Sequence, residues 1–121
     1  MYQDDESRID AAGQLAEHNP HAAAEALSDI AFDEAVGDEV RLSAAELLAD
    51  VDPGAAAPAC LAIARDQEVG DEVRLSAAEV LAEVDPGAAA PACLAIARDQ
   101  EVGDGVRQSA AEQLAVLGSS A

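Results

Sequence analysis

The sequence contains no lysine, and its charge is strongly one-sided. Its six basic residues are all arginines, they face 25 aspartates and glutamates, and the formal net charge is −19. Phosphate backbones and anionic membrane surfaces attract clusters of lysine and arginine. The composition therefore predicts no nucleic-acid partner and no membrane partner. The acidity itself leaves three explanations open: solubility, adaptation to high salt, or attraction to a basic partner.

Aromatic residues are nearly absent as well. Tyr2 and Phe32 are the only two, although half of the residues are hydrophobic, and alanine dominates that half. A core of this size usually depends on several large side chains that each bury much apolar area. Many small contacts must replace them here, which favours closely stacked helices. β-branched and aromatic residues are too sparse for a fold rich in strands.

Long apolar runs are also missing. No segment approaches the roughly 18 apolar residues that a membrane span needs. Residues 1–10 are polar and acidic and are not followed by the apolar segment of a signal peptide. We therefore expect a cytoplasmic protein. Its length of 121 residues fits one domain, residues 1–121.

The dominant feature of the sequence is an internal repeat with a period of 33 residues. Residues 36–68 and 69–101 differ at only two positions, a partial copy covers residues 102–117, and a diverged copy covers about residues 3–35. A fixed period of this size is typical of a solenoid, in which each unit buries its apolar face against its neighbours.

Each unit begins with the pattern of an amphipathic helix. Apolar residues recur at steps of three and four: Val40, Ala44, Leu47, Leu48 and Val51. Asp38 stands where an N-cap is expected. The sequence Asp52-Pro53-Gly54 should end this helix, because the residue before a proline avoids helical geometry and glycine permits a tight turn.

A second helix is expected from about Ala55 to Arg65 or Asp66. Pro58 would lie in its first turn, where a missing N–H costs little. One face of this helix would carry four small or apolar side chains: Ala57, Cys60, Leu61 and Ala64. Two helices in each unit, with a half unit at the end, predict seven helices in all.

The residues of each unit resemble a known family. The string Asp-Glu-Val-Arg, two residues, Ala-Ala, two residues and Leu, followed by Asp-Pro and a second Ala/Leu helix, is similar to HEAT repeats of the short phycobilisome-lyase type. The resemblance implies an all-α fold, an α-α superhelix (solenoid) of about 3.5 helical hairpins. It also implies a ladder between neighbouring units, formed by Asp38/Arg41, Asp71/Arg74 and Asp104/Arg107, with Asp5/Arg8 in the first copy.

The resemblance says little about function, because such repeats serve many unrelated tasks. We expect a non-catalytic protein–protein interaction or scaffold module that binds an unidentified protein on one solenoid face. The candidate contact residues are Glu39, Glu72, Glu46, Glu79, Arg65 and Arg98. The alternative is self-assembly into a homodimer, and an enzyme or a lyase-like activity is less favoured. For the Asp/Arg ladder a structural role is favoured over gripping acidic peptides.

No catalytic, metal or cofactor site is expected. Cys60 and Cys93 lack the spacing of a zinc site and fit a helical core better than a disulfide. His18 and His21 flank one turn and fit a polar cap better than a metal site. The serines that recur in the first helices have no recurring histidine to serve as a base: Ser43, Ser76 and Ser109.

The two ends of the array differ from its interior. Gln108 and Gln113 replace leucine or valine in the last copy, while Gln14 and His18 replace Leu47 and Val51 in the first. Terminal units of a solenoid need a polar outer face. These substitutions predict capped ends.

Overall fold

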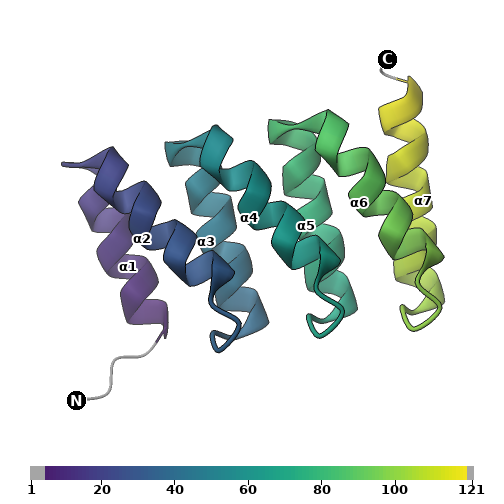
Figure 1. Cartoon of the computed structure of the whole chain (residues 1–121), viewed down its shortest axis with the longest axis horizontal. Helices are drawn as coiled ribbons and strands as arrows, with labels where there is room; N and C mark the ends of the chain where they lie inside the picture. The colour runs from purple at the N-terminus through teal and green to yellow at the C-terminus, as the bar shows by residue number, and fades with distance from the viewer. Residues whose placement is uncertain (1–4, 120–121) are drawn as a thin grey trace.

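The chain folds into a single row of helical hairpins (Figure 1). The structure is a computed structural model that describes residues 5–119, with the side chains of residues 7–117. Tyr2 lies outside the described residues. Within them the chain forms seven α-helices and no strand: α1 (Asp5–Ala16), α2 (Pro20–Phe32), α3 (Asp38–Val51), α4 (Pro53–Arg65), α5 (Asp71–Val84), α6 (Pro86–Arg98) and α7 (Asp104–Ser119). The predicted fold class, an all-α superhelix of helical hairpins, is confirmed.

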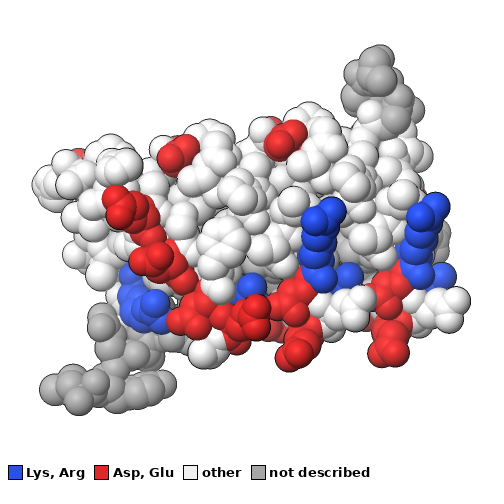
Figure 2. Space-filling model, in the orientation of Figure 1, with Lys and Arg blue, Asp and Glu red and all other residues white. Residues whose placement is uncertain are grey.

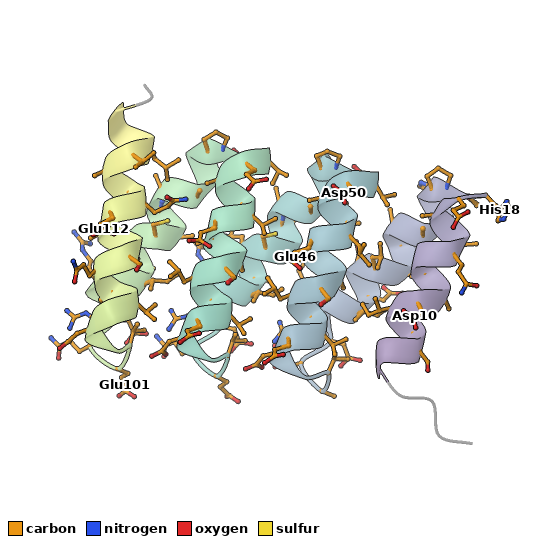
Figure 3. All side chains as sticks on the ribbon, turned by 180° about the vertical axis from the view of Figure 1, so that it is seen from behind. Asp10, His18, Glu46, Asp50, Glu101 and Glu112 are labelled. Atoms are coloured by element: carbon orange, nitrogen blue, oxygen red, sulfur yellow. The ribbon has the colours of Figure 1, made fainter. Side chains whose placement is uncertain are left out.

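The helices lie in two layers. Helices α2, α4 and α6 form the layer nearer the viewer in Figure 1, and α1, α3, α5 and α7 form the layer in front when the molecule is seen from behind in Figure 3. Each helix packs against the next one in sequence and against the next helix of its own layer. Helices α1 and α7 therefore lie at opposite ends of the row (Figure 1). We call the first layer the B layer and the second the A layer.

One aspartate separates the two helices of each interior unit. The N–H of Asp52 donates to the Leu48 carbonyl at 2.7 Å, which ends α3, and its side chain accepts from the Ala55 N–H at 3.3 Å, which caps α4. Asp85 makes the same two bonds in the next unit. The same residue is therefore the C-cap of α3 and the N-cap of α4, and it alone joins the two helices.

The second helix starts earlier than the sequence pattern predicts. It begins at Pro53, whose fixed φ suits the first helical position, and not at about Ala55. Pro58 therefore lies in the second turn and not the first, and it leaves the Gly54 carbonyl without its helical donor. Gly54 itself lies inside α4, and no described residue has a positive φ, so this turn needs no left-handed glycine.

The sequence pattern also predicts the N-cap of α3 one residue too late. Gly37 is the N-cap of α3 and makes no side-chain cap bond, while Asp38 is already the first helical residue. Its carboxylate still lies in the first turn, where the helix dipole favours negative charge. Because the backbone needs no cap from Asp38, its side chain is available for another contact, described below.

The core runs between the layers and consists mainly of small residues. In α3 the buried side chains are Arg41, Ala44, Ala45 and Leu48, and in α4 they are Ala56, Ala59, Cys60, Ile63 and Ala64. Two residues predicted on the buried face of α4, Ala57 and Leu61, are only half-buried. Cys60 and Ala64 are buried as predicted, and Ala56, Ala59 and Ile63 complete the buried face.

Three of the four polar substitutions at the ends of the row are exposed, as capped ends require: Gln14, His18 and Gln108. Gln108 is exposed and bonds to Glu112 at 3.4 Å, which fits a cap. Gln113, however, lines a recess with Glu79 of α5, so it faces the preceding unit. At the other end Leu15 is 37% exposed, while the equivalent Leu48 is completely buried.

The equivalent leucines provide a matched test of the core. Leu48→Ala should lower the free energy of unfolding by about 2–5 kcal/mol, because the deletion leaves a cavity among fully buried neighbours. Leu15→Ala should cost clearly less, because that side chain already contacts solvent. Urea unfolding followed by circular dichroism measures both. Equal losses would mean that the two positions are packed alike, contrary to the structure.

Candidate functional site

A buried arginine clamps each interior unit to the one before it. The side chains of Arg41 and Arg74 are only 4% exposed. The Nε of Arg41 donates to the Ala31 carbonyl at 2.9 Å, in the last turn of α2, while its Nη1 contacts Asp66 Oδ2 at 3.2 Å. Arg74 repeats this geometry. It donates to the Ala64 carbonyl at 2.9 Å and to Asp99 at 3.0 Å.

The aspartate of each clamp is itself held by the backbone. Asp66 Oδ1 accepts from the Glu68 N–H at 3.0 Å, and Asp99 Oδ1 accepts from the Glu101 N–H at the same distance. These backbone hydrogen bonds, followed by the arginine contacts, lower the pKa of both carboxyl groups below the ordinary 3.8. The loop after each B-layer helix is therefore fixed by two bonds to one side chain.

The structure does not build the ladder from the predicted partners alone. Asp38 Oδ2 accepts from the Gly70 N–H at 2.8 Å, and Asp71 Oδ2 accepts from the Gly103 N–H at 2.9 Å. These aspartates therefore link neighbouring units through backbone, whereas the arginines reach other aspartates. In the last copy Asp104 does approach Arg107, at 3.8 Å.

The aspartates that receive the arginines were missed by the sequence reasoning. Asp33, Asp66 and Asp99 recur with the 33-residue period, directly after the B-layer helix. That recurrence is the signal that could have identified them. In the first copy Arg8 lies 3.7 Å from Asp33, so the same pairing begins there. The side chain of Asp5 lies outside the described part of the chain.

Two equivalent recesses lie directly beside the clamps, on the B-layer side of the loops. One measures about 470 Å³ and the other about 420 Å³. The first is lined by Phe32, Glu34, Arg41, Ala62, Arg65, Asp66, Gln67 and Glu68, and the second by Arg65, Gln67, Arg74, Ala95, Arg98, Asp99, Gln100 and Glu101. Figure 2 shows charged side chains gathered along this edge of the B layer, while the opposite part of the same face is mostly uncharged.

Arg65 and Arg98 are the exposed cations of these recesses. Each is the last residue of its helix, followed at once by the clamp aspartate. Among the described residues, no ion pair involves either guanidinium, although acidic groups surround both. Gln67 and Gln100 add exposed amides beside them. Arg65 and Gln67 line both recesses, while Arg98 and Gln100 line only the second. Where the second recess has Arg65 and Gln67, the first has Phe32 and Glu34.

The other predicted contact residues lie elsewhere. Glu39, Glu46, Glu72 and Glu79 are all exposed, but they belong to the A-layer helices α3 and α5. Figure 3 shows Glu46 on that layer. The structure therefore separates the six candidates into an acidic A-layer group and an arginine pair in the B-layer recesses.

The remaining chemical groups are placed as follows. Cys60 and Cys93 are completely buried and unpaired. Burial, together with nearby Glu46, raises the pKa of the Cys60 thiol to about 11, which makes it a poor nucleophile.

His18 and His21 are exposed, and His21 Nε2 lies 3.2 Å from Glu25. Within residues 5–119, no helix is long and apolar enough to cross a bilayer.

The clamp aspartates make stability depend on pH. Their pKa values are lowered in the folded chain, so their contribution is present above about pH 3.8 and is lost as the pH falls through the folded value. An Asp66→Asn/Asp99→Asn variant should unfold at lower urea than the parent at pH 7, and this difference should shrink below pH 3.8. Urea titrations from pH 7 to pH 2 measure it. Glu46→Gln/Glu79→Gln, which changes two exposed carboxylates, is the control. If the difference in urea midpoint between the parent and the Asp66→Asn/Asp99→Asn variant did not change with pH, the role given to these aspartates would be contradicted.

Comparison with known proteins adds no identification. No family model matches the sequence, no curated protein matches it significantly, and no solved structure is significantly similar to its fold.

Proposed function

We propose that this chain is a non-catalytic protein-binding module that holds a partner segment in its two B-layer recesses. The observation that carries the proposal is an arginine and a glutamine that recur in the recesses of consecutive units, Arg65 and Gln67 in the first and Arg98 and Gln100 in the second. A surface repeated with a fixed period suits an extended or helical segment that runs along the row. The resemblance to HEAT-like repeats supports this use, since those solenoids serve as scaffolds.

The chemistry of the recesses favours carboxylates on the partner. A guanidinium donates several N–H groups in a planar fork that matches a carboxylate. The guanidinium groups of Arg65 and Arg98 can donate to a partner, whereas those of Arg41 and Arg74 donate to the Ala31 and Ala64 carbonyls within the fold. We therefore propose a partner segment with two acidic side chains, one for each exposed arginine.

The acidity of the chain limits what surrounds those two side chains. A net charge of −19 repels a uniformly acidic segment, but charges beyond about 8 Å are largely screened at physiological salt. Glu68 and Glu101 line the same recesses and would attract basic groups. The fitting segment therefore carries isolated carboxylates among neutral or basic residues. A cytoplasmic location and a scaffold role remain part of this proposal.

The arginine pair gives the proposal a direct test. Peptides are selected by phage display on the immobilised chain, and their affinities are measured by calorimetry. Arg65→Gln/Arg98→Gln should weaken binding at least tenfold, because a hydrogen bond to a charged group contributes about 1.5–3 kcal/mol. Binding should also weaken with added salt.

The matched control is Glu46→Gln/Glu79→Gln, which changes two exposed charges on the A layer and should leave affinity within about twofold. Selected peptides that bind the arginine double variant as tightly as the parent would sink the proposal. Peptides that respond only to the control variant would move the binding face to the A layer.

Self-assembly is a second candidate, favoured by apolar groups at the start of the row. Ala11, Leu15, Ala26 and Ile30 line a recess of about 290 Å³ there, with Arg8 and Asp29 at the same recess. The binding-module proposal expects a helical monomer of 12.2 kDa at every concentration, at low and at molar salt. Light scattering with circular dichroism measures this. A concentration-dependent dimer that Leu15→Glu dissolves would favour self-assembly, and helix that forms only in molar salt would assign the acidity to salt adaptation.

A further inference from the structure

The last helix of the row carries the buried stripe of an interior unit without its cover. In the interior units the alanine and leucine of this stripe are completely buried: Ala45 and Leu48 in α3, and Ala78 and Leu81 in α5. A B-layer helix, α4 or α6, packs on each of these helices. No helix in the described part of the chain packs on α7 in that way, so Ala111 is exposed and Leu114 is only half-buried.

The arginine of this stripe has only half of its clamp. Arg107 Nε donates to the Ala97 carbonyl at 3.2 Å, as its counterparts do to Ala31 and Ala64. In the interior units the other half is the aspartate that follows the unit's own B-layer helix. Within the described residues, Arg107 Nη1 instead meets Asp104 at 3.8 Å, and its side chain is 36% exposed against 4% for Arg41.

Two further groups at this edge differ from their interior counterparts in the same sense. The side chain of Asp104 is fully exposed, whereas Asp38 and Asp71 each accept a bond from the backbone N–H of a glycine in the next unit. Ala97 of α6 is half-buried, whereas Ala64 is completely buried. Apolar, cationic and anionic groups at one edge thus all match a B-layer helix and its loop.

We propose that this edge, formed by Ala97, Arg107, Ala111 and Leu114, binds one helix of a separate protein. The interior units define its chemistry, because equivalent residues hold such a helix there. The partner helix presents alanine and medium-sized apolar residues to the edge, as α4 and α6 do in the interior units. An aspartate follows its last turn. That aspartate contacts Arg107, and a backbone N–H beyond it meets Asp104.

A second copy of the chain fits this edge poorly. Its helices of the required type, α2, α4 and α6, are packed into its own row, and the two interior ones are buried along the stripe that would have to be presented. Isolated helices of about this length are marginal in water, so the partner helix gains much of its order on binding.

The chain supplies its own probe for the test. Residues 52–70 and 85–103 have the same sequence, which contains the helix cap, the helix, the aspartate and the glycine. A fluorescent peptide with this sequence is titrated with the full chain under reducing conditions, and its anisotropy is recorded. Saturable binding is expected, and Ala111→Glu in the chain should abolish it, because a charged side chain then occupies the apolar edge.

The ion pair is tested by a double-mutant cycle. Arg107→Gln in the chain and Asp99→Asn in the peptide should each weaken binding roughly tenfold, and the two together should weaken it little further, because both remove the same contact. Glu46→Gln, which removes an exposed charge on α3, is the control and should leave affinity unchanged. Urea unfolding verifies that each variant is folded, and Ala111 is exposed, so its replacement should not disturb the core.

Absence of binding would overturn the proposal, as would binding that persists in Ala111→Glu or is fully additive in the cycle. A dimer of the chain alone that Ala111→Glu dissolves would show that a second copy occupies the edge, which also overturns it. Because Arg65 and Arg98 play no part in this edge, the outcome is independent of the B-layer binding proposal.

Discussion

The arrangement of this molecule depends on one buried arginine in each unit. A core made mainly of alanine does little to fix how neighbouring helices are aligned, because its side chains are small and alike. Arg41 and Arg74 supply that information, because their donors are satisfied only when the preceding carbonyl and the following aspartate are both in place. A buried guanidinium without partners would be costly, and within the described residues no buried side-chain polar atom lacks one. We infer that the clamp selects a single stacking of otherwise permissive helices.

The clamp also determines where a binding surface can form. Arg65 and Asp66 are consecutive, but their side chains point in different directions at the end of α4. Asp66 contacts Arg41, while Arg65 faces solvent. The next unit repeats this with Arg98 and Asp99. A rigid loop with an exposed arginine is thereby reproduced at a fixed spacing. Such repetition is what allows a solenoid to hold a long partner segment along one face.

The two ends of the row differ in what they leave uncovered. At the first end, Leu15 and its alanine neighbours line a recess with Arg8 and Asp29, and Arg8 already lies 3.7 Å from the aspartate that follows α2, Asp33. At the last end, apolar groups are accompanied by a half-used arginine and an exposed aspartate, Arg107 and Asp104. Polar groups with defined partners specify a ligand far more narrowly than apolar area does, because an unsatisfied partner carries a penalty. The second edge is for that reason the more selective surface.

The sequence by itself determined the number of helices, their order and the hairpin architecture, because the period of 33 and the helical spacing of apolar residues are local patterns. It did not locate helix starts to the residue, since the caps at Gly37 and Asp52 depend on backbone geometry. It identified Arg41 and Asp38 as linking residues but not their partners. Only the tertiary structure decided that Arg41 reaches Asp66, 25 positions away, and that Asp38 meets the Gly70 backbone, because both contacts form only after neighbouring hairpins stack.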